Sequence, residues 1–179
     1  MSIKTLKTGI NVDKMVHEVS IIDNFLTDDE CDFLIDYFKK SSNHSTYQRT
    51  STIELKNTSI FDFRKSYIRF KYTYRIKRKF KIKKLYDQLV FWPVSSFKLS
   101  HIDTDIILSK NKKLASVDWT SVCYLNDNYV GGETVIAENK IKPKKGRLVV
   151  FPSKKLYHGV LPVEKSSRFT FISWWSNYD

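Results

Sequence analysis

The sequence predicts a mainly β domain of the α+β class, built as a sandwich, jelly roll or barrel. The first observation is a series of at least six short segments, most of them after Leu85, that are rich in β-branched and aromatic residues. The second is that tight turn signals separate these segments, with no obvious linker between them. A third is a capped helix signal near the N-terminus, so we expect helices to support the strands from that end.

The length of 179 residues fits one domain, or one domain with a short N-terminal extension. We expect residues 1–18 to form a loosely ordered lead-in and residues 19–179 to form a single domain with its strand core at about residues 85–175. A hydrophobic content of 41% is enough for a real core, and 12 Phe, 10 Tyr and 4 Trp make that core rich in aromatic rings.

The first expected elements are a short strand at residues 19–22 and a helix. The segment Thr27-Asp28-Asp29-Glu30 is a capping box, in which the Thr27 hydroxyl accepts from the Glu30 amide and Glu30 reaches back. The helix that follows carries an apolar stripe at spacings of 3, 4 and 7 residues, formed by Cys31, Leu34, Ile35 and Phe38. Polar residues at positions 41–44 end it.

The remaining strands follow from short apolar or alternating runs. They are expected at residues 51–55, 89–92, 97–107, 119–125, 133–137, 147–151 and 168–175. The turn signals between the later strands are Asn126-Asp127-Asn128, Gly131-Gly132, Pro143-Lys144-Lys145-Gly146 and Pro152-Ser153. We interpret Gly131-Gly132 as a turn only.

Most of the net charge of +12 comes from one segment, the basic tract Arg64–Lys84. It contains 11 Lys or Arg and no acid, whereas the rest of the chain holds 20 bases and 19 acids. Apolar residues alternate with polar ones from Ile68 to Ile76, as in a strand, but they also recur every four residues up to Phe80, as in a helix. The β-branched and aromatic content favours a strand.

The basic tract is expected to attract an acidic partner, such as nucleic acid, an acidic protein or an anionic surface. Aromatic residues interleaved with basic ones also resemble a surface for single-stranded nucleic acid. The simpler interpretation, which we favour for the aromatic residues, is that they face the core while Lys and Arg face water.

Only two cysteines are present, Cys31 and Cys123, and they form no CxxC pair. A thiolate zinc site or a disulfide framework is therefore not expected, and a reducing compartment fits best. The first 15 residues contain no apolar run typical of a signal peptide, and no stretch is apolar enough for a membrane span. We expect a cytoplasmic or other intracellular location.

One set of residues has the pattern of a metal site. His101 and Asp103 lie two apart in an expected strand, so their side chains share a face and can reach one ion. His158 is the best third ligand, and two His with one carboxylate form the facial triad of non-haem Fe(II) oxygenases. Arg168, at the start of the last expected strand, can hold a carboxylate through two parallel hydrogen bonds, which suits 2-oxoglutarate.

Simpler interpretations exist for each residue. Asp105 shares the face of His101, but Asp103 is the nearer ligand, and His17 and His44 are read as ordinary surface residues. Arg168 as a plain surface arginine and Tyr124 as a core tyrosine are the competing interpretations for the other two candidates.

Several motifs in register resemble the prolyl-4-hydroxylase-like Fe(II)- and 2-oxoglutarate-dependent dioxygenases. The matching pieces are His101-Ile102-Asp103, Tyr124-Leu125-Asn126-Asp127, Gly131-Gly132-Glu133-Thr134, Pro143-Lys144-Lys145-Gly146, Phe151, His158-Gly159-Val160, Pro162-Val163, Arg168 and Trp174. A weaker match at residues 22–31 resembles the family's entry helix, so the resemblance covers about residues 19–175. Two segments depart from the family pattern, Trp92-Pro93-Val94-Ser95-Ser96 and Ser166-Ser167.

The resemblance implies a double-stranded β-helix (jelly roll, cupin-like) with helices packed on one side. It implies Fe(II) held by His101, Asp103 and His158, with 2-oxoglutarate and O2 as cosubstrates and ascorbate as an optional reductant. It places Arg168 and Tyr124 on the 2-oxoglutarate carboxylate and Trp174 as a packing aromatic behind the site. Its chemistry converts 2-oxoglutarate and O2 to succinate and CO2 while a C–H bond is hydroxylated.

Three classes of function remain open at this point. The first is a hydroxylase of proline or another residue in a protein or peptide, which the motifs favour. The second is a dioxygenase acting on nucleic acid; the demethylase branch of that kind carries a second arginine where this chain has Trp174. The third is a non-catalytic binding module that keeps the fold. Substrate and oligomeric state are not encoded in any of the motifs.

Overall fold

The computed structural model describes residues 3–7, 18–47, 49–55, 62–103 and 116–178. Its elements in chain order are β1 (Ile3–Lys7), β2 (Glu18–Ile22), α1 (Asp28–Lys40), β3 (Ser45–Tyr47), β4 (Thr50–Glu54), α2 (Phe63–Phe80), β5 (Ile82–Trp92), β6 (Lys98–His101), β7 (Trp119–Tyr124), β8 (Val130–Gly131), β9 (Thr134–Ile136), β10 (Asn139–Ile141), β11 (Leu148–Phe151), β12 (His158–Val160), β13 (Val163–Lys165) and β14 (Arg168–Asn177).

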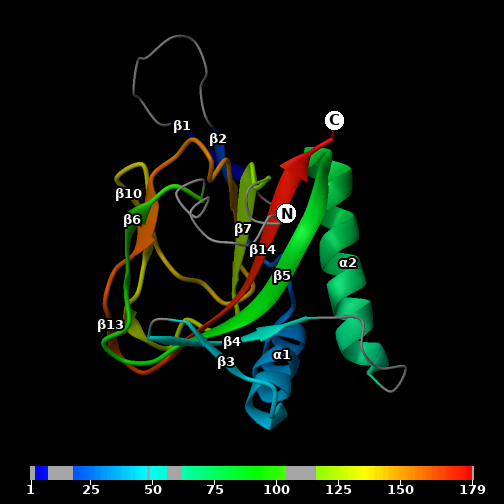
Figure 1. The fold of residues 1–179 in the computed structure, drawn as a ribbon, viewed down its shortest axis with the longest axis vertical. Helices are drawn as coiled ribbons and strands as arrows, with labels where there is room; N and C mark the ends of the chain where they lie inside the picture. Colours follow the sequence, from blue (N-terminus) through cyan, green and yellow to red (C-terminus); the bar gives the residue numbers. More distant parts are fainter. Residues whose placement is uncertain (1–2, 8–17, 48, 56–61, 104–115, 179) are drawn as a thin grey trace.

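Two antiparallel sheets face each other across the molecule (Figure 1). The major sheet has eight strands in the order β1-β2-β11-β7-β14-β5-β4-β3, and the minor sheet has four in the order β10-β9-β12-β6. A short β13-β8 pair joins them at one end. This arrangement is a jelly roll, so the predicted mainly β double-stranded β-helix is confirmed.

Side chains alternate between the two faces of the major sheet, and the two faces have different surroundings. Along β14, Phe169, Phe171 and Trp175 belong to the large apolar core behind the sheet. The intervening Arg168, Ile172 and Trp174 line a cavity on the opposite face, toward the minor sheet. Because successive side chains of a strand point to opposite sides, one strand builds both the core and the cavity wall.

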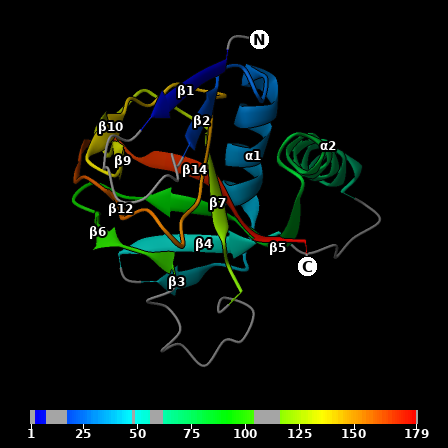
Figure 2. The same cartoon turned by 90° about the horizontal axis from the view of Figure 1, so that it is seen from above.

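Both helices cover the back of the major sheet, as the view from above shows (Figure 2). Helix α1 begins at Thr27, whose side chain accepts from the Glu30 amide while the Glu30 side chain accepts from the Thr27 amide. The predicted capping box is therefore confirmed. Cys31, Leu34 and Phe38 are buried from this helix, which confirms the stripe that the sequence indicates.

Most of the basic tract, up to Phe80, forms α2, so the preference for a strand was wrong there; only residues 82–84 belong to a strand, the start of β5. Ile68, Tyr72 and Ile76 are buried in the core at a spacing of four, and Phe80 packs against them. The alternation of polar and apolar residues arises because aromatic rings also occupy the outer face of α2. Burial at one helical stripe outweighs the modest strand preference of aromatic and β-branched residues.

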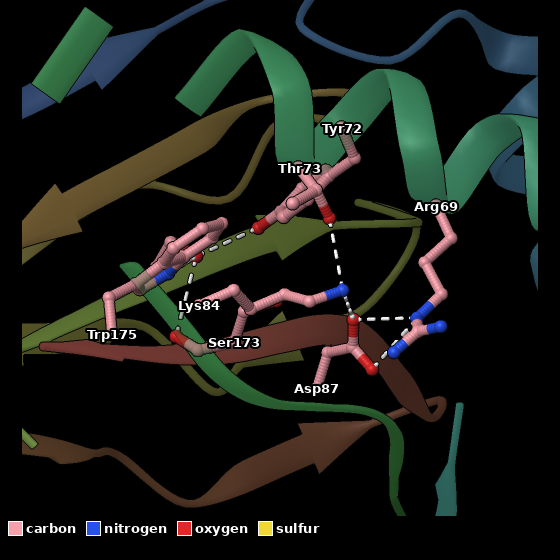
Figure 3. A network of polar contacts seen from close by, with 8 residues as sticks. Arg69, Tyr72, Thr73, Lys84, Asp87, Ser173 and Trp175 are labelled. Carbon is pink, nitrogen blue, oxygen red and sulfur yellow. Dashed lines mark hydrogen bonds and ion pairs between the residues drawn. The ribbon is translucent and has the colours of Figure 1, made fainter. Parts of the chain in front are cut away.

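Polar groups fix α2 to the sheet beneath it (Figure 3). The Tyr72 hydroxyl lies 3.0 Å from the Ser121 hydroxyl, which also accepts from the Trp175 indole at 2.8 Å. Nearby, the buried Asp87 carboxylate accepts from Arg69 Nε at 2.8 Å and from Lys84 Nζ at 2.7 Å. Two partners of opposite charge offset the cost of burying this acid.

The other strand predictions are confirmed within a few residues, with some differences. Residues 3–7 of the expected lead-in pair with β2, so this part is ordered, because an exposed sheet edge accepts a further strand. Strand β6 ends at His101 rather than at residue 107; residues 104–107 lie outside the described part of the chain. The short strands β3, β10, β12 and β13 carry too few residues for a periodic signal.

Within the described residues, neither helix is long and apolar enough to cross a membrane. Cys31 and Cys123 are buried free thiols, in agreement with the expected lack of a disulfide.

The Tyr72 contact is expected to stabilise the docking of α2. Replacement of Tyr72 by Phe should lower the free energy of unfolding by about 0.5–1.5 kcal/mol, because a buried hydrogen bond is lost. Tyr74→Phe, on the exposed side of the same helix, is the matched control and should leave stability unchanged. Urea denaturation of the two variants measures the difference; equal stabilities would contradict a role for this contact.

Candidate active site

A cavity of about 420 Å³ lies between the two sheets. Its wall comes from the front faces of β4, β5, β7 and β14 in the major sheet and from β6, β9 and β12 in the minor sheet. His101, Asp103, His158 and Arg168 all line it. The structure thus brings the predicted metal ligands and the predicted carboxylate-binding residue into one space.

The two histidines are neighbours because β12 pairs with β6. His158 stands directly opposite His101 in this antiparallel pair, and their ring centroids lie 4.4 Å apart. Asp103 Oδ1 lies 3.8 Å from His101 Nε2 and 3.5 Å from His158 Nε2. The three ligand atoms lie within 4.8 Å of one another, close enough that small side-chain movements would bring all three to bonds of about 2 Å with one ion.

Backbone carbonyls orient both imidazole rings. His101 Nδ1 lies 2.9 Å from the Leu99 carbonyl oxygen, and His158 Nδ1 lies 3.0 Å from the Leu156 carbonyl oxygen. A carbonyl can only accept, so each Nδ1 carries a proton, and each Nε2 is the ring nitrogen turned toward the shared centre. Burial and the nearby His158 lower the pKa of His101, which favours the neutral, ligating form.

Asp103 lies just beyond the end of β6, not within a strand as the sequence indicates. Its position is fixed by its backbone N–H, which donates to the Ser153 carbonyl at 3.1 Å, and by the Thr120 hydroxyl, which donates to Oδ2 at 2.5 Å. Burial opposes ionisation, but the contacts from His158, Ser153 and Thr120 prevail and lower the pKa of Asp103. The carboxylate is therefore charged, with Oδ1 turned to the histidines.

Arg168 occupies a buried position at the start of β14, with 1% of its surface exposed. Its guanidinium lies over the rings of Trp92 and Tyr124, 4.8 and 5.4 Å from their centroids. One nitrogen, Nη2, donates to the Thr134 hydroxyl at 3.1 Å. Nε and Nη1 have no hydrogen-bond partner among the described residues, which is costly for a buried cation and indicates a place for an anionic ligand.

Tyr124 lies beside Arg168 and shares a hydrogen-bond acceptor with it. Its hydroxyl donates to Thr134 Oγ1 at 2.7 Å, and burial raises its pKa, so it stays protonated. Thr134 accepts two hydrogen bonds, from Tyr124 and Arg168, which leaves its own proton free to donate into the cavity that it lines. Tyr124 is thus buried as a core residue and also placed beside Arg168.

Sequence reasoning missed several supporting residues. Thr134 was quoted only as part of a motif, and Thr120 had no signal because its partner Asp103 is distant in sequence. Gly132 is more than a turn residue: at φ +64° a side chain there is strained, and a Cβ would lie 3.2 Å from the Tyr129 ring and 3.4 Å from Arg168 Cδ. Its lack of a side chain lets Val163 and the Tyr129 ring pack closely against this turn.

The remaining candidate residues lie in different places. Trp174 lines the cavity, and it is Trp175 that packs behind the sheet, so the expected packing role of Trp174 was assigned one residue too early. His44 is exposed and contacts the Ser41 carbonyl and the Ser51 hydroxyl, as expected of a surface residue. His17 and Asp105 lie outside the described residues.

A jelly roll that holds two imidazoles, one carboxylate and a buried guanidinium around one cavity has the composition of a non-haem iron oxygenase site. Residues 94–176 match the model of the 2OG-Fe(II) oxygenase superfamily. The resemblance predicted from the motifs is therefore confirmed, and enzymes of this superfamily use Fe(II), 2-oxoglutarate and O2. No curated protein sequence matches the chain.

Solved structures with the same fold include three prolyl hydroxylases. The Pseudomonas putida prolyl-4-hydroxylase is 17% identical, with a TM-score of 0.68 and coverage of 91% of this chain and 94% of that one. The viral collagen prolyl hydroxylase from Paramecium Bursaria Chlorella virus-1, solved with 2OG, is 23% identical, with a TM-score of 0.66 and coverage of 90% and 96%.

The third structure is a Trichoplax adhaerens prolyl hydroxylase in complex with a hypoxia inducible factor peptide fragment. It is 21% identical to this chain, with a TM-score of 0.69 and coverage of 89% and 83%. At these identities the three likenesses establish the fold, over nearly the whole chain.

The Thr134 hydroxyl is expected to stabilise the part of the cavity that Tyr124 and Arg168 form. Thr134→Val keeps the shape but removes the acceptor of both Tyr124 and Arg168, which should lower the free energy of unfolding by about 1–3 kcal/mol. Thr46→Val, at an exposed position of β3, is the control and should change little. Chemical denaturation measures both; a stable Thr134→Val variant would show that the two donors find other partners.

Proposed function

We propose that this protein is an Fe(II)- and 2-oxoglutarate-dependent dioxygenase that hydroxylates a proline or another residue of a protein or peptide. The observation that carries the proposal is the pairing of two sites in one cavity. A His-Asp-His cluster that suits one metal ion faces the same space as a buried arginine with two unpartnered N–H donors.

Each side chain has a role that follows from its position. His101 Nε2, His158 Nε2 and Asp103 Oδ1 would bind the ion, while Thr120 holds the other carboxylate oxygen. Nε and Nη1 of Arg168, with the Thr134 hydroxyl, would bind the far carboxylate of 2-oxoglutarate. Bound Fe(II) would supply, with 2-oxoglutarate and O2, the oxidising power for hydroxylation of a C–H bond, with succinate and CO2 as coproducts.

The walls of the cavity serve to orient ligands and exclude water. Val90, Trp92, Val122 and Ile172 provide an apolar lining between the metal ligands and Arg168. A low-polarity wall strengthens the ion pair between a guanidinium and a carboxylate.

A peptide is the proposed substrate class for two reasons. Among proteins of the same fold, the Trichoplax adhaerens enzyme was solved with a peptide fragment. The basic tract, which motivated the nucleic-acid alternative, forms α2 on the back of the major sheet, across the sheet from the cavity (Figure 2). A single-domain organisation over residues 19–179, an intracellular location and the use of ascorbate belong to the same proposal.

The ligand assignment leads to a prediction for three variants. Asp103→Ala and His158→Ala should abolish Fe(II) binding, because each removes one of three ligands. Arg168→Ala should keep iron but weaken 2-oxoglutarate binding by about ten- to hundredfold, since it removes a charge-assisted pair. Anaerobic titration calorimetry measures both ligands.

His44→Ala is the matched control, because it removes an exposed histidine outside the cavity, and it should bind both ligands normally. Comparable iron affinity in the Asp103, His158 and Arg168 variants would remove the assignment.

Turnover tests the proposed reaction itself. With Fe(II) and ascorbate, the protein should convert 2-oxoglutarate to succinate slowly, and proline-rich peptides should increase the rate more than oligonucleotides do. Mass spectrometry of the peptides should show the gain of one oxygen atom. If the protein neither binds iron nor forms succinate, it is a binding module. If only oligonucleotides are oxidised, the reaction class stands and the peptide proposal fails.

A further inference from the structure

Four aromatic rings form a ridge along the outer face of α2. Phe63, Tyr67, Phe70 and Tyr74 are 76%, 62%, 66% and 52% exposed. Their spacing of four, three and four residues places them on one side of the helix, opposite the buried Ile68, Tyr72 and Ile76. We call these four residues the aromatic ridge. Such a row of exposed rings is uncommon on a soluble surface and indicates a docking site.

Basic side chains continue the ridge at its C-terminal end. Lys77 and Arg78 follow Tyr74 by three and four residues, so they lie on the same side of α2. Lys79, Lys81 and Lys83 come next, and all five are exposed and form no ion pair with any residue that the structure describes. We call these five residues the basic end.

Several other cations of the basic tract already form ion pairs. Arg64 pairs with Asp29, Lys65 with Asp62 at 3.3 Å, and Lys71 with Glu30 at 2.6 Å. Arg69 and Lys84 share the buried Asp87. These paired cations contribute to the fold, whereas the cations of the basic end form no ion pair with any described residue. The basic end is thus available to a polyanion.

We propose that the aromatic ridge and the basic end together bind single-stranded nucleic acid. Base stacking on successive rings needs exposed aromatic faces, and a phosphate backbone needs cations alongside them. Phe70 and Tyr74 stack on each other, with centroids 6.0 Å apart and an interplanar angle of 18°, so the pair offers its outer ring faces to bases. Duplex nucleic acid offers the phosphates but keeps its bases stacked internally.

Two other occupants fit less well. A second copy of this chain would bring the same cations against each other, because the helix Phe63–Phe80 contains eight Lys or Arg and no acid. An anionic membrane would accept the basic end, but half of the ridge is tyrosine, whose hydroxyl prefers the polar interface to the acyl chains.

The proposed surface is separate from the cavity. The ridge is on the outer face of α2, and α2 packs on the back of the major sheet, whereas the candidate ligands His101 and His158 belong to the minor sheet, on the opposite side of the major sheet (Figure 1). A strand bound there would anchor the protein and would not place a base at the His-Asp-His cluster. The inference therefore does not depend on iron or on 2-oxoglutarate.

The test measures binding of the full-length protein, without metal, to a fluorescent oligothymidine of about 12 nucleotides, a typical site size for such surfaces. Fluorescence anisotropy should show binding that is tighter than for a duplex of equal length. The Phe70→Ala/Tyr74→Ala variant should bind at least about tenfold more weakly, because two stacking platforms are lost. Both rings are exposed, so circular dichroism should show an unchanged fold.

Charge is tested with a matched pair of variants. Lys77→Gln/Arg78→Gln should weaken binding and reduce the slope of log affinity against log salt by about 1.4, as expected for two lost phosphate contacts. Lys140→Gln/Lys142→Gln removes the same charge from exposed sites on and beside β10 and should have little effect. Equal effects of the two pairs of substitutions would show that binding depends on net charge alone, and would overturn the proposed site.

Two further results would also overturn the proposal. One is oligothymidine affinity that Phe70→Ala/Tyr74→Ala leaves unchanged. The other is failure to bind oligothymidine while vesicles of phosphatidylserine and phosphatidylcholine bind in a manner that depends on the same two rings, which would assign the ridge to a membrane surface.

Discussion

The pairing of β12 with β6 is the contact on which the candidate site depends. It sets His158 opposite His101 although 57 residues separate them in the sequence. Backbone carbonyls two residues before each histidine then fix the ring orientation, so both Nε2 atoms converge where Asp103 Oδ1 already lies. A change of one residue in this register would turn one imidazole to the other face of the minor sheet.

The major sheet separates the cavity with the candidate site, on one face, from the apolar core and the helices, on the other. Alternation along β14 and β5 sends polar and aromatic groups into the cavity and a large apolar set toward α1 and α2. The helices stabilise the sheet from behind through the core and through the Asp87 and Tyr72 contacts. Because the back is covered in this way, the cavity can keep unpartnered donors that a small core could not otherwise tolerate.

Much of the fold was predictable because its signals are local. The capping box at Thr27 and the turns at Gly131-Gly132 and Gly146 identify their elements without knowledge of the rest of the chain. The motif spacing also selected residues that line one cavity, although their roles stay predictions and Asp103 is held by the Ser153 carbonyl and not by a strand. Helix α2 was not predictable, because the aromatic residues on its outer face give the sequence an alternation of polar and apolar residues that is typical of a strand. Thr120 and Thr134 act through partners distant in sequence.

The unsatisfied donors of Arg168 also make the stability of the folded protein depend on the ligands available to it. A buried guanidinium in which two nitrogens find no partner among the described residues raises the free energy of the unliganded protein, and a dicarboxylate that binds these nitrogens would lower it. Ligand binding to the folded state alone adds stability that grows with the logarithm of ligand concentration. Metabolic supply of such an acid would then govern how long each molecule survives, as well as how fast it works.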